Sequence, residues 1–308
     1  MKNVILNLLP FNNREDMTPI EYIIKKSLAF VLIYFAAALL GEVVVIGTMA
    51  VMGYDPLHGV MPNGTVVWAS TYYGFAVFIA VTLLYCKVFE KRSIKSVLKG
   101  KAVDYLTGSL LGMAVLSVII LITCVSGSIS FMGINTKIGV GTLILYLFGF
   151  IVQTGAEEIM CRGFLLGALN KRLPVWVSVL ISSIAFVIPH LSSILACEPK
   201  YAVVGIVNTF LISFIFSMLV LKRGSIRIAW GMHFAWNFVL NSIMGLTVSG
   251  GESVSEGPLA FSVNEGSLLN GGVYGIEASI VTTAILGVIF IALFAILYKK
   301  GRGENGIQ

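Results

Sequence analysis

Two adjacent carboxylates and a guanidinium occupy the middle of a long apolar run. Glu157, Glu158 and Arg162 lie in a hydrophobic stretch that begins near Val140 and ends at Lys171. A charge near the centre of a bilayer costs on the order of 3 kcal/mol, so such charges are expected to pair or to do chemistry. Glu158 and Arg162 are four residues apart and can form an ion pair on one helix face. Glu157 lies about 100° around the helix, which makes it the candidate for a chemical role.

Two histidines and an asparagine lie in later apolar segments. His190 follows Phe186 by four residues, and His233 precedes Asn237 by four residues, so His233 and Asn237 share one helix face. A carboxylate in an apolar pocket has a raised pKa and can act as a general base. Imidazoles can position water, bind a metal or donate to an oxyanion, and an asparagine amide donates without carrying charge. Together with Glu157, these residue types suit the hydrolysis of a peptide bond by activated water.

The composition indicates which elements must hold these groups. Of 308 residues, 57% are hydrophobic and only 12% are charged, which is typical of a polytopic α-helical membrane protein. The apolar runs are continuous, which argues against a membrane β-barrel. We therefore expect an all-α fold with about eight transmembrane helices and no separate soluble domain. The expected spans are roughly 27–51, 66–86, 104–125, 138–170, 174–190, 201–221, 226–248 and 277–298.

The placement of Lys and Arg predicts the orientation. The loop 87–101 is rich in both, the loop 249–276 has neither, and only Lys137 and Lys200 fall on the weakly charged side. The positive-inside rule then places both termini in the cytoplasm. The +6 net charge reflects these membrane-flanking residues and does not indicate nucleic acid. The short loops and the lack of a targeting extension favour a bacterial inner membrane. The expected divisions are a cytoplasmic segment 1–26, one transmembrane domain 27–298 with its motif core at about 138–248, and a cytoplasmic tail 299–308.

Helical rise tests whether the polar groups can meet. The span 138–170 would be about 45 Å long if straight, so it must tilt. Measured from the cytoplasmic end of each span, Glu157 lies about 21 Å deep and His190 about 24 Å deep. His233 lies about 9 Å deep, with Asn237 about 6 Å farther along. These depths allow Glu157 and the two histidines to share one buried site, provided that the helix of Glu157 does not end at Arg162.

The polar residues form three short motifs, one around Glu157, one ending at His190 and one beginning at His233. In this order on successive spans, the three motifs are similar to those of the CPBP family of intramembrane proteases. That family includes the type II CAAX prenyl endopeptidases and the bacterial bacteriocin self-immunity and abortive-infection proteins. The resemblance covers about 155–240 with no departure at the motif positions. The motifs are Glu157-Glu158-xxx-Arg162, Phe186-xxx-His190 and His233-xxx-Asn237.

The resemblance implies a role for each catalytic candidate. Glu157 would take a proton from the attacking water, and His190 would hold that water with it. His233 and Asn237 would stabilise the tetrahedral oxyanion. The substrate would be a membrane-associated protein or peptide in the lipid bilayer. In eukaryotes the family cuts prenylated CAAX proteins, and in bacteria it is linked to peptide maturation and bacteriocin immunity.

The resemblance leaves metal dependence open. Glu158 and Arg162 would brace the helix and the pocket. Family members are described as metal-dependent in some accounts and as glutamate proteases in others. The chain lacks HExxH, whose two histidines on one helix face would be a stronger zinc signal. Glu157, His190 and His233 on three helices could still bind zinc.

Two other functions fit the same residues. In a proton- or ion-coupled transporter, Glu157, Glu42 and the histidines would relay charge, although the sequence shows no inverted repeat. In a non-catalytic bacteriocin-immunity membrane protein, the motifs would be structural and the chain would bind a peptide or a partner helix. Glu42, in the first span, is otherwise expected to pack or to line a cavity. Gly108 and Gly112 predict close helix packing in the third span.

Overall fold

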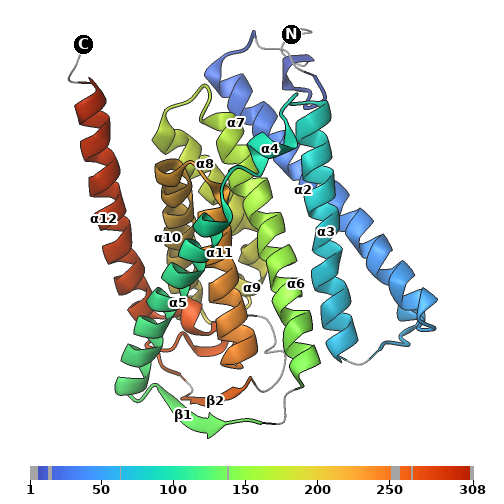
Figure 1. Cartoon of the computed structure of the whole chain (residues 1–308), viewed down its shortest axis with the longest axis vertical. Helices are drawn as coiled ribbons and strands as arrows, with labels where there is room; N and C mark the ends of the chain where they lie inside the picture. Colours follow the sequence, from blue (N-terminus) through green and yellow to red (C-terminus); the bar gives the residue numbers. More distant parts are fainter. Residues whose placement is uncertain are drawn as a thin grey trace. The chain divides into compact units, whose positions relative to one another are not determined.

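The computed structural model describes residues 6–12, 16–62, 64–136, 139–250, 257–264 and 266–305. Within these residues, seven helices are long and apolar enough to cross a membrane (Figure 1). The all-α prediction is confirmed, and the chain is a multi-pass membrane protein. Two compact units share the chain. One comprises Met1–Lys99 and Ile144–Ala185, and the other comprises Gly100–Leu143 and Phe186–Gln308.

The first unit contains the N-terminal helices and the helix of the glutamate pair. Its elements are α2 (Pro19–Val51), α3 (Gly64–Val88), the short α4 (Ile94–Val97), most of α6 (Val140–Glu158), a π-helical segment (Ile159–Leu166), α7 (Gly167–Leu169) and most of α8 (Val175–Val187). A 3-10 turn (Pro56–His58) lies between α2 and α3.

The helix α2 begins earlier than the expected residue 27. Thr18 and Glu21 form a capping box, in which Glu21 Oε2 accepts from the Thr18 N–H at 2.7 Å and Thr18 Oγ1 accepts from the Glu21 N–H at 3.2 Å. Pro19 follows the cap at a position where its missing N–H costs nothing. The polar end of the expected cytoplasmic segment is therefore helical, and Lys26 within it is buried against Glu90.

The helix of the glutamate pair is long, as the sequence predicts. The helical segment Val140–Leu169 runs without a break, close to the expected span 138–170. It does not end at Arg162, which lies inside the π-helical segment Ile159–Leu166. The helix that carries Glu157 therefore continues past Arg162, as the comparison of depths requires.

The second unit contains the helices of the two histidine motifs. Its elements are α5 (Ala102–Val125), β1 (Ile129–Ile134), a 3-10 turn (Ile188–His190), α9 (Leu191–Leu195), α10 (Pro199–Arg223), α11 (Ile226–Phe238), a π-helical turn (Val239–Ile243), β2 (Leu259–Val263), two 3-10 turns (Gly272–Tyr274 and Ile276–Ala278) and α12 (Ile280–Asn305). The expected span 226–248 corresponds to α11 with its π-helical turn, which together cover residues 226–243 and are not among the seven helices that are long and apolar enough to cross a membrane.

Three glycines fix the contact between α5 and α11. A Cβ added at Gly108 would lie 2.0 Å from the carbonyl oxygen of Ile228, and one at Gly112 would lie 2.6 Å from that of Met232. From the other side, a Cβ at Gly231 would lie 2.0 Å from the carbonyl oxygen of Tyr105. The two backbones touch because none of these positions carries a side chain. The close packing predicted from the small-xxx-small pair is confirmed, and its partner is the helix that carries His233 and Asn237.

The end of α10 is fixed by a turn and an ion pair. Gly224 adopts a left-handed conformation at φ 66° and ends the helix, and α11 begins two residues later. Arg223, in the last turn of α10, donates from Nε to Oδ1 of Asp104 on α5 at 2.7 Å. Asp104 also accepts from the Lys101 N–H at 2.9 Å and so caps α5. The turn and the pair hold α5, α10 and α11 together within this unit.

A small antiparallel sheet forms where the sequence predicts only loops. β1 pairs with β2 from Ile129 opposite Val263, and Figure 1 shows the two strands beside the ends of α5 and α11. Asn270 holds the following turn by donating to the carbonyl oxygens of Ser128 at 2.8 Å and Asn264 at 2.7 Å. The described part of the long loop is therefore folded onto its own unit.

The sequence-based expectation for Glu42 is wrong, and the one for Lys137 falls outside the described residues. Glu42 is exposed on α2, so the expectation that it packs or lines a cavity is wrong. Lys137, which contributes to the charge asymmetry, lies outside the described residues. The orientation of the termini and the three-part domain division stay predictions.

Candidate active site

The predicted ion pair of the first motif is present in the first unit. Arg162 donates from Nη1 to Oε1 of Glu158 at 3.0 Å, and both side chains are fully buried. Glu157 accepts a hydrogen bond from the side-chain amide of Gln153, one helical turn earlier. The two adjacent carboxylates therefore interact with different neighbours, as their angular separation predicts.

Two motif helices widen at their motifs. The α-helical pattern of α6 gives way to a π-helix directly after Glu158, and Arg162 lies within the wider segment Ile159–Leu166. In the other unit, α11 gives way to the π-helical turn Val239–Ile243 two residues after Asn237. π-Helical segments are rare and occur frequently at functional sites. The sequence patterns, which assume a regular period, did not predict either one.

The second motif closes into a hydrogen bond between its first and last residues. His190 lies in the 3-10 turn that follows α8, and its Nδ1 is 2.8 Å from the carbonyl oxygen of Phe186. A carbonyl oxygen only accepts, so Nδ1 carries the proton and Nε2 of the neutral ring is an acceptor. The spacing of the motif therefore sets the tautomer of His190.

The third motif lies on one face of α11, as predicted. Nδ2 of Asn237 is 3.4 Å from Nε2 of His233, and both residues are about 6% exposed. The imidazole of His233 is stacked on Phe216 with ring centroids 5.2 Å apart, and it meets Phe186 edge-on at 5.8 Å. Because Phe186 also contacts His190 at 4.9 Å, this ring packs against both imidazoles.

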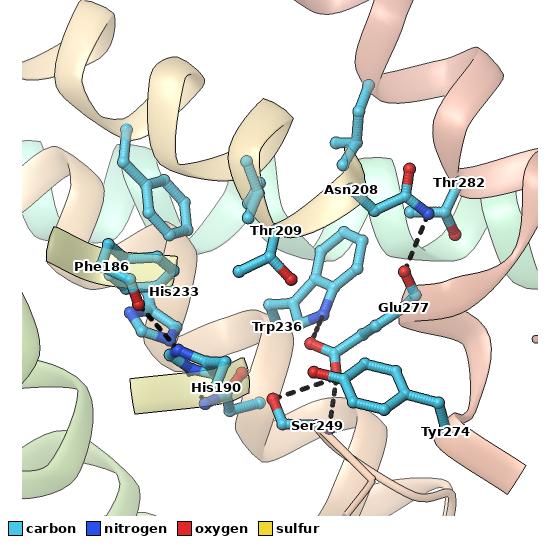
Figure 2. Close-up of a pocket in the computed structure, with 14 residues that line it drawn as sticks. Phe186, His190, Asn208, Thr209, His233, Trp236, Ser249, Tyr274, Glu277 and Thr282 are labelled. Atoms are coloured by element: carbon cyan, nitrogen blue, oxygen red, sulfur yellow. Dashed lines mark hydrogen bonds between the residues drawn. The ribbon is translucent and has the colours of Figure 1, made fainter. Parts of the chain in front are cut away.

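One pocket in the second unit brings the histidine motifs together. His190, His233 and Asn237 all line it, although they come from different parts of the chain (Figure 2). The pocket has about 470 Å³ of space between atoms when its open mouth is included, but only about 40 Å³ of it can hold the centres of water-sized molecules. Its other polar side chains with an oxygen or amide group come from α10, from the segment that precedes α12 and from α12 itself. These are Asn208, Thr209, Ser249, Tyr274, Glu277 and Thr282.

Glu277 is a pocket residue that the sequence analysis missed. Its Oε1 accepts from the indole Nε1 of Trp236 at 3.1 Å, and its Oε2 accepts from the N–H and the hydroxyl of Ser249 (Figure 2). Burial raises the pKa of the Glu277 carboxyl above its ordinary value. The Ser249 N–H, His190, the Trp236 indole and His233 oppose that rise, because each favours the charged form.

No local pattern marks Glu277 in the sequence. It lies 41 residues after Trp236, at the end of a long loop and just before an apolar run. A glutamate in that position is ordinarily a solvated charge at the membrane boundary. Only the tertiary fold of the loop brings it to α11.

The sequence leaves open a metal site formed by Glu157, His190 and His233. Among the residues that the structure describes, no three His, Cys, Asp or Glu side chains are arranged to hold a metal ion. The described side chains as placed do not form a zinc ligand set, and zinc stays a prediction. Glu157 belongs to the first unit and both histidines belong to the second. The shared site of these three residues and the catalytic roles of all the motif residues likewise stay predictions.

Comparison with known proteins identifies the segment that carries the motifs. No curated protein matches the chain. The family model described as "Type II CAAX prenyl endopeptidase Rce1-like" matches residues 139–239, about a third of the chain. The match includes all six polar motif residues. Residues 139–239 are thus similar to the Rce1-like type II CAAX prenyl endopeptidases, and this match supports membership of the CPBP intramembrane proteases.

Proposed function

We propose that the chain is an intramembrane endopeptidase that uses Glu157 to activate water against a peptide bond of a membrane-associated substrate. The observation that carries the proposal is the family match over residues 139–239, which includes every motif position. The pocket of the second unit supports it, because His190, His233 and Asn237 line one cavity.

The base in this proposal is the second carboxylate of the first motif. Arg162 donates to Oε1 of Glu158, whereas Glu157 accepts a hydrogen bond from the side-chain amide of Gln153. Glu157 takes a proton from water, and the resulting hydroxide attacks the carbonyl carbon of the substrate. The tetrahedral intermediate then collapses, the C–N bond breaks, and the proton passes to the leaving amine. The products are a new carboxyl terminus and a new amine.

The histidine motifs supply the water site and the oxyanion donors. Nε2 of His190 is the acceptor nitrogen of its ring, so it can hold one hydrogen of the attacking water. The amide of Asn237 carries two N–H groups, and its Nδ2 lies near Nε2 of His233. An imidazole nitrogen that accepts from an amide has no proton to donate. Asn237 is therefore the stronger candidate for the oxyanion donor, and His233 joins it when the imidazole is protonated.

The substrate class follows from the membrane setting and the family. We propose a CAAX-like lipidated protein or a hydrophobic leader peptide as the substrate. A bacterial inner membrane with both termini in the cytoplasm is part of the same proposal. Zinc held by Glu157, His190 and His233 is a separate proposal, and no catalytic step above depends on it.

Incubation with a defined peptide library tests the function. Purified wild type and Glu157→Gln are incubated with farnesylated CAAX peptides and hydrophobic leader peptides, and the products are read by mass spectrometry. Cleavage by wild type alone supports the protease, and loss of cleavage with a chelator followed by rescue with Zn²⁺ supports the metal. A folded wild type that cleaves nothing contradicts the proposal. Proton-coupled flux in liposomes would then favour a transporter, and protection that survives Glu157→Gln would favour an immunity protein.

A further inference from the structure

The pocket contains a carboxylate that the proposed mechanism does not use. Both oxygens of Glu277 accept hydrogen bonds, one from the Trp236 indole and the other from Ser249. The main chain of Glu277 is also held, because its carbonyl oxygen accepts from Nδ2 of Asn208 on α10 at 2.8 Å. Glu277 therefore connects α10, α11 and the loop that begins at Ser249 (Figure 2).

The backbone of Ser249 is strained in a way that this carboxylate explains. Ser249 has φ 52°, and it is one of two described residues other than glycine with a positive φ. Such a conformation is unfavourable for a residue that carries a side chain, and it persists only where the surroundings enforce it. Here both the N–H and the hydroxyl of Ser249 donate to Oε2 of Glu277. Two hydrogen bonds to one oxygen of the Glu277 carboxyl therefore hold the loop against the pocket.

The other end of the link lies between two motif residues. Trp236 follows His233 by three residues and directly precedes Asn237 on α11, and all three line the pocket. The indole is about 4% exposed, and its N–H reaches Oε1 of Glu277. A hydrogen bond at this position limits how far α11 can rotate about its axis, because the helix carries Trp236 and Asn237 as one rigid body.

We propose that Glu277 is a positioning residue that holds Trp236 and Ser249 so that His233 and Asn237 keep their orientation in the pocket. The inference rests on the proposed function, because it assigns Glu277 to the support of the oxyanion donors.

Isosteric substitutions test the role. Glu277→Gln keeps the shape of the side chain and places an amide NH₂ against either the indole N–H or the Ser249 donors. Trp236→Phe removes only the link to α11. Glu198→Gln, at an exposed carboxylate of the same unit, is the matched control. Selective ¹⁵N labelling reports the Trp236 indole and the Asn237 side-chain amide, each assigned as the signal that is lost in Trp236→Phe or in Asn237→Ala.

We expect the ¹⁵N signals and kcat for peptide cleavage to change together. In Glu277→Gln both labelled signals move, and kcat for peptide cleavage falls about 10- to 100-fold while KM changes little. Trp236→Phe moves the Asn237 signal and lowers kcat, and Glu198→Gln does neither. An Asn237 signal that stays in place in Glu277→Gln overturns the inference. A signal that moves with unchanged kcat per folded enzyme also overturns it. If wild type cleaves no peptide, the proposed function fails, and the Asn237 signal alone decides whether Glu277 positions α11.

Discussion

Arg162 and Glu158 form a fully buried ion pair, with Nη1 of the guanidinium 3.0 Å from Oε1 of the carboxylate. Both side chains lie on a helix of a membrane protein, where neither charge can be hydrated by bulk water. Removing one partner of such a pair leaves a buried charge uncompensated, which costs about 3–5 kcal/mol. The pair is therefore a structural requirement of the helix that carries Glu157.

Single and double substitutions test the pair. Arg162→Met and Glu158→Gln should each clearly lower the unfolding temperature in detergent, because each removes one charge of a buried ion pair. The double variant should recover part of that loss, because it removes both charges. Glu42→Gln, at an exposed carboxylate of the same unit, should unfold at the wild-type temperature. Single variants as stable as Glu42→Gln would show that the pair does not hold the helix.

The glycine contact between α5 and α11 should tolerate no side chain. Gly108→Ala would place a methyl group 2.0 Å from a backbone oxygen, so the two helices must separate. We expect a loss of about 1–3 kcal/mol in stability and a lower rate of cleavage, because α11 carries two motif residues. Gly287→Ala in α12 is the control, since its Cβ would meet nothing within 4 Å. Equal unfolding temperatures for the two variants would contradict the packing.

Asn237→Ala should separate binding from chemistry. If the amide stabilises the oxyanion, its loss removes an interaction that forms only in the transition state. We expect kcat to fall about 10²–10³-fold with little change in KM. Steady-state kinetics on a cleaved peptide measures both constants. A higher KM with normal kcat would instead assign Asn237 to substrate binding.

Lys171 should contribute to the pH dependence of the free energy of unfolding. Lys171 is exposed, but partial desolvation of its ammonium group and the nearby cations Arg92 and Lys26 lower its pKa below the ordinary value, although Glu90 opposes this. Between the lowered value and the ordinary one, the unfolded chain binds more protons than the folded protein, so stability rises with pH. Near neutral pH, the charge on Lys171 therefore opposes folding.

Lys171→Gln should remove that cost. The variant should unfold at a higher temperature than wild type near pH 7, and the gain should shrink as the pH rises toward about 10. Differential scanning fluorimetry across this range gives the curve. Lys95→Gln, at another exposed lysine of the same unit, is the control and should show no such trend. A pH-independent difference, or a less stable Lys171→Gln, would contradict the assignment.

Much of the fold could be predicted because membranes restrict the possibilities. Apolar runs long enough to span a bilayer gave the all-α class and the continuous helix past Arg162, and helical spacing gave the pairing of Glu158 with Arg162. The spacing of His233 and Asn237 likewise placed both on one face of α11. These features depend on neighbours in sequence, which a single chain displays directly.

The remaining features depend on tertiary contacts that no local period encodes. The role of Glu277 needs the long loop to fold back onto α11, and the pairing of β1 with β2 joins segments more than 100 residues apart. Hydropathy alone also gave no reason to expect the exposure of Glu42, since a carboxylate within an apolar run can lie on any face.

The rate of peptide cleavage by Glu157→Gln tests the central claim most directly. Glutamine keeps the shape of the side chain and can bond to Gln153, but it cannot take a proton from water. We expect kcat to fall by about 10²–10⁴-fold with the unfolding temperature unchanged, while Glu42→Gln keeps the wild-type rate. A Glu157→Gln protein that cleaves the same peptide at the wild-type rate would contradict the assignment of Glu157 as the base.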